Sequence, residues 1–203
     1  SAASDVYKRQ VVDPSVLPNA GLARPISVTA PDGSILNCAH PAAVNGRVQT
    51  CQRVADLILG ALAQAAPARV SACTNSTCTV ALFSGTRQSG PEQGTYWVYL
   101  ETIGGGGGAR PDADGLDGIH VHATNTSNLP VEALEVEYPL ILERYELVDG
   151  SEGAGRQRGG MGLRRVYRAT EDCLVRVDIS RNLSRSWGLD GGGEGGHGSY
   201  ATG

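Results

Sequence analysis

The chain has 203 residues, of which 40% are hydrophobic and 19% charged, and these values are typical of a globular protein and exclude a disordered chain. The length suffices for one domain or a large part of one. The formal net charge of -4 gives no electrostatic reason to expect nucleic acid or an anionic membrane as a partner. No stretch of the sequence approaches the roughly 20 apolar residues that span a bilayer.

Residues 1–10 differ in composition from the rest of the chain. The stretch DVYKRQ matches the translation of a transposase adapter used in sequencing libraries, and Lys8 is the only lysine. All basic residues from position 11 onward are arginine, which is typical of a GC-rich genome. We therefore predict that residues 1–10 are non-native and that residues 11–203 are an internal fragment of a larger subunit.

The cysteines indicate the redox compartment. They are odd in number and form no CxxC pair, which favours free thiols over disulfides; they are Cys38, Cys51, Cys73, Cys78 and Cys173. We therefore expect a cytoplasmic protein.

The N-terminal part of the chain combines turns with one helix. Ile26 and Val28 alternate before a PDG turn and predict a short strand. Apolar side chains then recur at helical spacing over residues 45–66, where Asn45 is the expected N-cap and Pro67 ends the helix. We expect the apolar stripe of this helix to be buried and its polar face, which carries Gln52, Arg53 and Asp56, to point away from the core.

The pattern from residue 70 onward is typical of β-structure. Runs of β-branched and aromatic residues predict strands at 96–103, 134–138, 141–145, 163–169 and 174–179. Because the helix comes first and the strands follow in series, we predict an α+β fold that is mostly antiparallel β-sheet, with one clear amphipathic helix at about 45–66. The chain would form a partial domain of a larger subunit.

The stretch ETIGGGGGARPDADGLDGIHVHATNTSN, residues 101–128, holds the clearest polar candidates. His120 and His122 are two residues apart, so in a strand both imidazoles would point to one face and could bind a metal or share acid–base work. A structural role for their hydrogen bonds is equally compatible with the pattern. The five glycines lack the lysine of a phosphate-binding loop, and they fit either a close approach to a ligand or a flexible turn.

Four arginines lie in the glycine-rich stretch GSEGAGRQRGGMGLRR, at Arg156, Arg158, Arg164 and Arg165. They could clamp a phosphate or carboxylate bidentately. A solvated hairpin with exposed arginines is the alternative.

Taken in order, these motifs resemble the hydantoinase B/oxoprolinase family. The resemblance covers nearly everything from about residue 13 onward, and it is carried by HPAAVNGRVQTCQRVADLILGALAQAAP, YLETIGGGGGARPDADGLDGIHVHATNTSNLPVEALEVEYPL, RYELVDGSEGAGRQRGGMGLRRVYR and SWGLDGGGEG. The family includes N-methylhydantoinases, 5-oxoprolinases and the related acetone and acetophenone carboxylases.

The resemblance implies a hetero-oligomeric enzyme that hydrolyses hydantoin or 5-oxoproline type rings with ATP. In this family ATP phosphorylates the cyclic amide on an A-type subunit or fused domain, and the B-type part completes ring opening with water. The resemblance also implies a divalent metal, whose histidine and aspartate ligands lie in the N-terminal half of the B-type subunit. That half lies outside this chain, so no metal ligand is assigned here and the fragment alone should be inactive.

We expect five residues to line the substrate pocket or the subunit seam: Glu101, Arg110, His120, His122 and Asn125. No catalytic residue is assigned. Two alternatives stay open: a subunit of an ATP-dependent ketone carboxylase, and a non-catalytic glycine-rich scaffold that holds the A-type partner.

Overall fold

The computed structural model describes residues 27–124 and 126–203, together with residues 13, 15, 17, 21 and 24. The prediction of non-native sequence at residues 1–10 therefore lies outside the described part. In chain order the elements are α2 (Arg47–Ala63), η2 (Pro67–Arg69), β1 (Thr79–Thr86), β2 (Tyr96–Ile103), α3 (Val131–Glu137), β3 (Leu140–Val148), β4 (Gly162–Ala169) and β5 (Leu174–Asp178). Among the described residues, no helix is long and apolar enough to cross a membrane.

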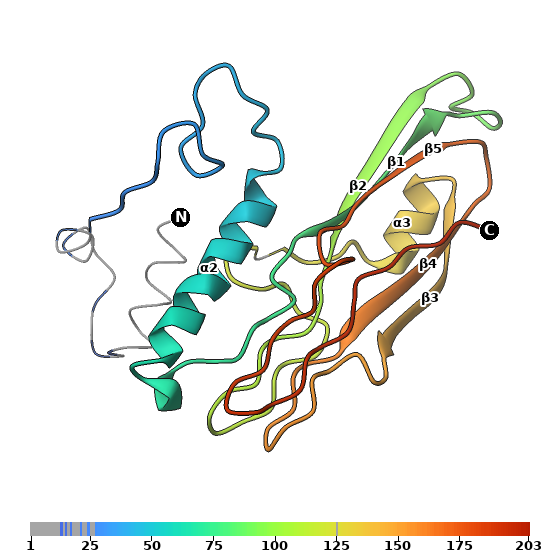
Figure 1. Cartoon of the computed structure of the whole chain (residues 1–203). Coiled ribbons are helices and arrows are strands. Elements are labelled where there is room, and N and C mark those ends of the chain that lie inside the picture. Colours follow the sequence, from blue (N-terminus) through green and yellow to red (C-terminus); the bar gives the residue numbers. More distant parts are fainter. Residues whose placement is uncertain are drawn as a thin grey trace.

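The strands form two antiparallel sheets, which confirms the predicted α+β class. β1 pairs with β2 and with β5 in a three-stranded sheet, and β3 pairs with β4 in a second sheet. In Figure 1 helix α2 stands on one side of the molecule, and both sheets, with α3 beside β3 and β4, lie on the other side. Four of the five strands predicted from residue 70 onward are confirmed, as β2, β3, β4 and β5.

The main core lies between the two sheets and α3. Alternation along β2 buries Trp97 and Tyr99 on its inner face. Phe83 of β1 lies on the same face, and its ring centroid is 4.9 Å from that of Tyr167 on β4. Leu134 of α3 is fully buried in this cluster. Aromatic packing therefore joins the hairpin β3–β4 to the three-stranded sheet.

The predicted strand at 134–138 is wrong, because these residues belong to α3 and its C-cap. Leu134 and Tyr138 are four residues apart, so a helix places both on the core side, and they pack in the same cluster. Val136 would share their face in a strand, yet it is 84% exposed. Glu132 in the first turn favours the helix through the helix dipole.

Two further local predictions are corrected. The N-cap of helix α2 is Gly46, which makes no side-chain hydrogen bond, so the prediction of Asn45 as N-cap is wrong. The helix ends at Ala63, before the predicted end, and the chain then turns into η2. Val28 lies in irregular, exposed backbone rather than in a strand, because no described strand pairs with it. Ile26 lies outside the described residues.

The polar face of α2 is the buried one, contrary to the prediction. Gln52 and Asp56 are 0% and 2% exposed, whereas Leu57 of the apolar stripe is 66% exposed. Gln52 accepts a hydrogen bond from the backbone N–H of Ala123 at 3.3 Å and donates its amide to Thr124. These partners compensate for the desolvation of the polar groups, which is why a polar face can be buried here.

The glycine run after β2 packs closely against protein backbone and does not form a flexible turn. A Cβ on Gly106 would lie 1.9 Å from the carbonyl oxygen of Gly160, and one on Gly108 would lie 1.8 Å from that of Ala72. Only glycine permits this approach. Figure 1 shows the glycine-rich loops running side by side, and backbone bonds such as Gly160 N–H to Gly107 O (2.8 Å) join them.

Candidate functional site

Strand β2 places Glu101 on its inner face, where the side chain is buried among polar partners. The carboxylate accepts hydrogen bonds from Asn128 Nδ2 (2.8 Å), the Leu129 N–H (3.0 Å), Tyr167 Oη (2.8 Å) and Arg165 Nη1. Burial alone would raise the pKa of Glu101, but the hydrogen bonds from Arg165 and the neighbouring hydroxyls outweigh it and hold the pKa below its usual value. Glu101 is therefore an ionised, fully hydrogen-bonded group; we call it and these partners the Glu101 cluster.

Arg165 forms the cationic half of this cluster. Its side chain is 0% exposed, and its guanidinium lies 4.4 Å from the ring centroid of Tyr145 and 5.3 Å from that of Tyr167. The other arginines of the predicted cluster pair with carboxylates or backbone on the chain: Arg158, for example, binds Asp117 with both terminal nitrogens. The four arginines together therefore do not form the predicted clamp for an external phosphate or carboxylate.

His120 and His122 do not share a face, so that expectation is wrong. Neither lies in a strand, and the backbone turns at His122, which has a φ of 50°. His120 is a neighbour of Glu101: burial lowers the pKa of His120, and the Glu101 carboxylate opposes that shift. His122 instead reaches helix α2, where its Nε2 lies 3.0 Å from Oδ1 of Asp56.

Asp56, Thr74 and His122 form a second buried group, the Asp56 cluster. Thr74 donates its hydroxyl to Oδ2 of Asp56 at 2.8 Å and lies 3.2 Å from Nε2 of His122. Burial would raise the pKa of Asp56, but the hydrogen bond from His122 and the other donors lower it below its usual value. This cluster joins α2 to the loop before β1 and to the loop after β2, so its role is structural.

The remaining predicted residues, Arg110 and Asn125, are not part of either cluster. Arg110 is exposed in the loop that follows the glycines, where its backbone N–H bonds to Ala113 O at 2.9 Å. Asn125 lies outside the described residues.

Sequence reasoning missed Asp56, which it placed on a solvent-facing surface. The sequence feature that could have identified Asp56 as buried is its one-turn spacing from Gln52, directly beside the small apolar residue Ala55.

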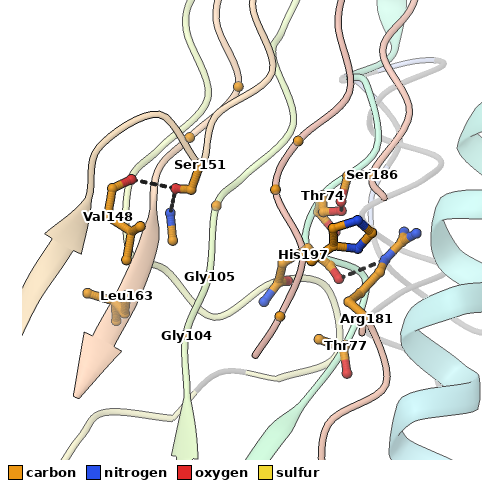
Figure 2. A pocket seen from close by; sticks show the side chains of 18 of the residues that line it. Thr74, Thr77, Gly104, Gly105, Val148, Ser151, Leu163, Arg181, Ser186 and His197 are labelled. Atoms are coloured by element: carbon orange, nitrogen blue, oxygen red, sulfur yellow. Dashed lines mark hydrogen bonds between the residues drawn. The ribbon is translucent and has the colours of Figure 1, made fainter. Parts of the chain in front are cut away.

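A cavity of about 1710 Å³ separates the hairpin β3–β4 from the segment around residues 72–79 and the C-terminal loops. Figure 2 shows Val148, Ser151 and Leu163 on one side of it, and the other labelled side chains, which include Thr74, Arg181 and His197, across from them. The wall mixes apolar and polar groups, which suits a small organic ligand.

Arg181 stabilises this wall through hydrogen bonds to several of its segments. It donates to Asn75 O at 3.2 Å, to Arg185 O at 2.7 Å and to Cys73 Sγ at 2.9 Å. Burial raises the pKa of the Cys73 thiol to about 11, so the group is protonated at neutral pH and is a poor nucleophile. All five cysteines are free thiols, as predicted.

The described residues contain no group of three or more His, Cys, Asp or Glu side chains that could hold a metal ion. The two histidines of the HVH motif have different neighbours, Glu101 and Asp56. The side chains in this part of the chain therefore do not fit a metal centre, and no step is assigned to one here.

The family model "Hydantoinase B/oxoprolinase" matches residues 1–202, so the chain belongs to this family. It is 37% identical over 183 residues to a Pseudomonas sp. (strain NS671) protein named as the B-type subunit of a D-/L-hydantoinase, covering 90% of this chain and 30% of the relative. It is 35% identical over 196 residues to 5-oxoprolinase 1 of Arabidopsis thaliana, covering 96% of this chain and 14% of the relative. The chain thus spans at most about a third of these relatives, which agrees with a partial domain.

Two solved structures share the fold. The ATP-dependent caprolactamase from Pseudomonas jessenii superposes with a TM-score of 0.69 at 27% identity, over 89% of this chain and 32% of that one. An acetone carboxylase in its nucleotide-free form gives a TM-score of 0.59 at 19% identity, over 85% of this chain and 24% of that one. The second likeness shows the fold alone.

Proposed function

We propose that the chain is part of the B-type component of an ATP-dependent cyclic-amide hydrolase, which opens hydantoin or 5-oxoproline type rings. The observation that carries this is family membership over residues 1–202, with relatives named as a hydantoinase B-type subunit and as 5-oxoprolinase. The likeness to an ATP-dependent caprolactamase, also named for a lactam, supports the same reaction class.

The chemistry divides between two partners. A lactam carbonyl is a poor electrophile, and phosphorylation on oxygen gives an imidate with a far better leaving group, so ATP removes the main barrier before water attacks. We propose that an A-type subunit or fused domain binds ATP. The sequence here carries no GxxxxGK[ST] motif and no lysine after Lys8, which is compatible with that division.

The pocket assignments stay proposals. We propose that Glu101 and His120 contribute to the substrate pocket, because Glu101 bonds to Arg165 and Tyr167 of the cavity wall and its charge acts on His120. Arg110 and Asn125 remain candidates for the pocket or the subunit seam. His122 is better suited to holding helix α2 through Asp56 than to touching substrate. We place the divalent metal and its ligands elsewhere in the full protein, which we expect to be cytoplasmic.

The test is a coupled assay on the full-length protein that contains this chain, reconstituted with an A-type partner. It receives ATP with 5-oxoproline, hydantoin or caprolactam, and in parallel acetone with bicarbonate. ADP release matched by ring-opened product supports the hydrolase. Bicarbonate-dependent turnover of the ketone alone would replace it with the carboxylase, whose fold this chain shares. A folded complex with no turnover of any substrate would favour the scaffold.

A further inference from the structure

Four buried polar atoms on residues around Glu101 have no hydrogen-bond partner among the described residues: Nε and Nη2 of Arg165, the hydroxyl of Tyr99 and Nε2 of His120. Buried polar atoms are nearly always paired, so unpaired ones that gather in one place indicate a missing ligand or water. Glu101 itself is not short of partners, because four donors reach its two oxygens. The unpaired groups therefore belong to the surroundings of the carboxylate.

The two unpaired nitrogens of Arg165 form one edge of its guanidinium. Glu101 occupies Nη1, which leaves Nε and Nη2 as a side-by-side pair of N–H donors. This edge offers two parallel hydrogen bonds to planar oxygen ligands. Nε2 of His120 can act as an acceptor when the ring proton is on Nδ1, and burial lowers the pKa of His120 and favours that neutral ring.

Charge decides which planar ligand fits. The carboxylate of Glu101 already neutralises the guanidinium of Arg165, since the two form a buried ion pair. A ligand carboxylate would place a second buried negative charge beside one positive charge, which is costly. A neutral amide carbonyl takes the same two hydrogen bonds without adding charge, and its N–H can meet an acceptor such as His120.

Arg165 belongs to the wall of the cavity. The ring centroid of Tyr145 lies 4.4 Å from its guanidinium carbon, and Tyr145 is 48% exposed. A hydrogen bond of 3.2 Å from the Tyr145 hydroxyl to Asn128 Oδ1 holds this ring. A ligand would therefore approach Arg165 from the cavity.

We propose that Arg165 binds the carbonyl oxygen of a neutral cyclic amide through Nε and Nη2, while His120 accepts the ring N–H. This assignment rests on the proposed function and names the side chains that select the substrate class. Arg165 acts on the amide that every lactam substrate shares, so a carboxylate on the ring is not what it recognises.

The test uses Arg165→Lys in the full-length protein with its A-type partner, because lysine keeps the charge beside Glu101 and loses the paired donors. The probes are 2-pyrrolidinone, a bare lactam, and 5-oxoproline, the same ring with a carboxylate. We expect KM for both to rise about thirtyfold, which corresponds to about 2 kcal/mol, with KM for ATP unchanged. Arg176→Lys is the control, because Arg176 is exposed on β5 and pairs with Asp178 outside the cavity.

An unchanged KM for both lactams overturns the proposal, and so does a rise for 5-oxoproline alone, which would mean that Arg165 binds the carboxylate. If Arg165→Lys does not fold, His120→Phe takes its place: a tenfold rise in KM for 2-pyrrolidinone supports the site, and no rise overturns it. If the wild type turns over no lactam, the proposed function fails. Calorimetry then tests the site alone, through binding of 2-pyrrolidinone to the wild type and its loss in the variant.

Discussion

Asp56 of helix α2 and His122, 66 positions later in the chain, meet with 3.0 Å between Oδ1 and Nε2, and both side chains are almost fully buried. This contact connects the only long helix of the described residues to the loop that follows the glycine run. It explains why the polar face of α2 turns inward, and it separates His122 from its sequence neighbour His120.

Replacement of Asp56 by alanine should strongly destabilise the protein. The change leaves His122 and Thr74 without their shared acceptor, and breaking a buried pair costs about 3–5 kcal/mol. The free energy of unfolding of the full-length protein in urea measures the effect. Asp178→Ala is the matched control, because its pair with Arg176 is exposed and should change stability by less than about 1 kcal/mol. Equal losses for the two variants would contradict the structural role of the Asp56 cluster.

Stability should fall in acid partly because of Asp56. Its folded-state pKa lies below the usual value, so the unfolded chain binds more protons and stability rises with pH through that window. The contribution is complete above the unfolded pKa of about 3.9 and is lost as the pH falls through the folded pKa. Unfolding free energies between pH 5 and pH 3 should therefore drop more steeply for the wild type than for Asp56→Asn. Parallel slopes would show that Asp56 titrates normally.

Alanine at Gly106 should disrupt the loop layer. The new Cβ would lie 1.9 Å from the carbonyl oxygen of Gly160, and backbone on both sides leaves little room to relax. Overpacked sites typically cost about 1–3 kcal/mol, and we expect a loss at the upper end of this range or failure to fold, because the clash is with backbone. Gly46→Ala is the control, since its Cβ would meet only a side-chain atom at 3.8 Å. Thermal melts of the two variants give the comparison, and a harmless Gly106→Ala would refute close backbone packing.

The helical assignment of residues 131–137 can be tested with two alanines. Leu134 is 0% exposed and Val136 is 84% exposed, although a strand would place both on one face. Leu134→Ala should cost about 2–5 kcal/mol and Val136→Ala should change stability little. Denaturant unfolding of the two variants measures this difference. Similar costs at both positions would support the strand instead.

The sequence predicted the elements whose periodicity is long and unmixed. β2 was predicted at its observed bounds from the aromatic and β-branched run YWVYLETI, but which face is buried became clear only from the structure, because both faces of this run are largely apolar. Residues 134–138 were misassigned because two alternations over so short a stretch do not distinguish a strand from a helix, and the contact that decides, Leu134 with the aromatic core, is tertiary.

The candidate site was only partly readable for the same reason. Glu101 and His120 could be selected as polar groups near glycine turns, but Arg165 looked like one of four similar arginines. Its partner is 64 positions away, and only the packing of the hairpin against the sheet brings the two together. Asp56 looked like an ordinary polar position on a helix, since nothing local shows that the partner loop covers it.

The most direct test of the central claim is the stoichiometry of the reconstituted full-length complex with 5-oxoproline. The proposed function predicts one ADP released for each ring opened, with no ring opening when ATP is left out. Ring opening without ATP, or ADP release with the ring intact, would contradict an ATP-dependent cyclic-amide hydrolase.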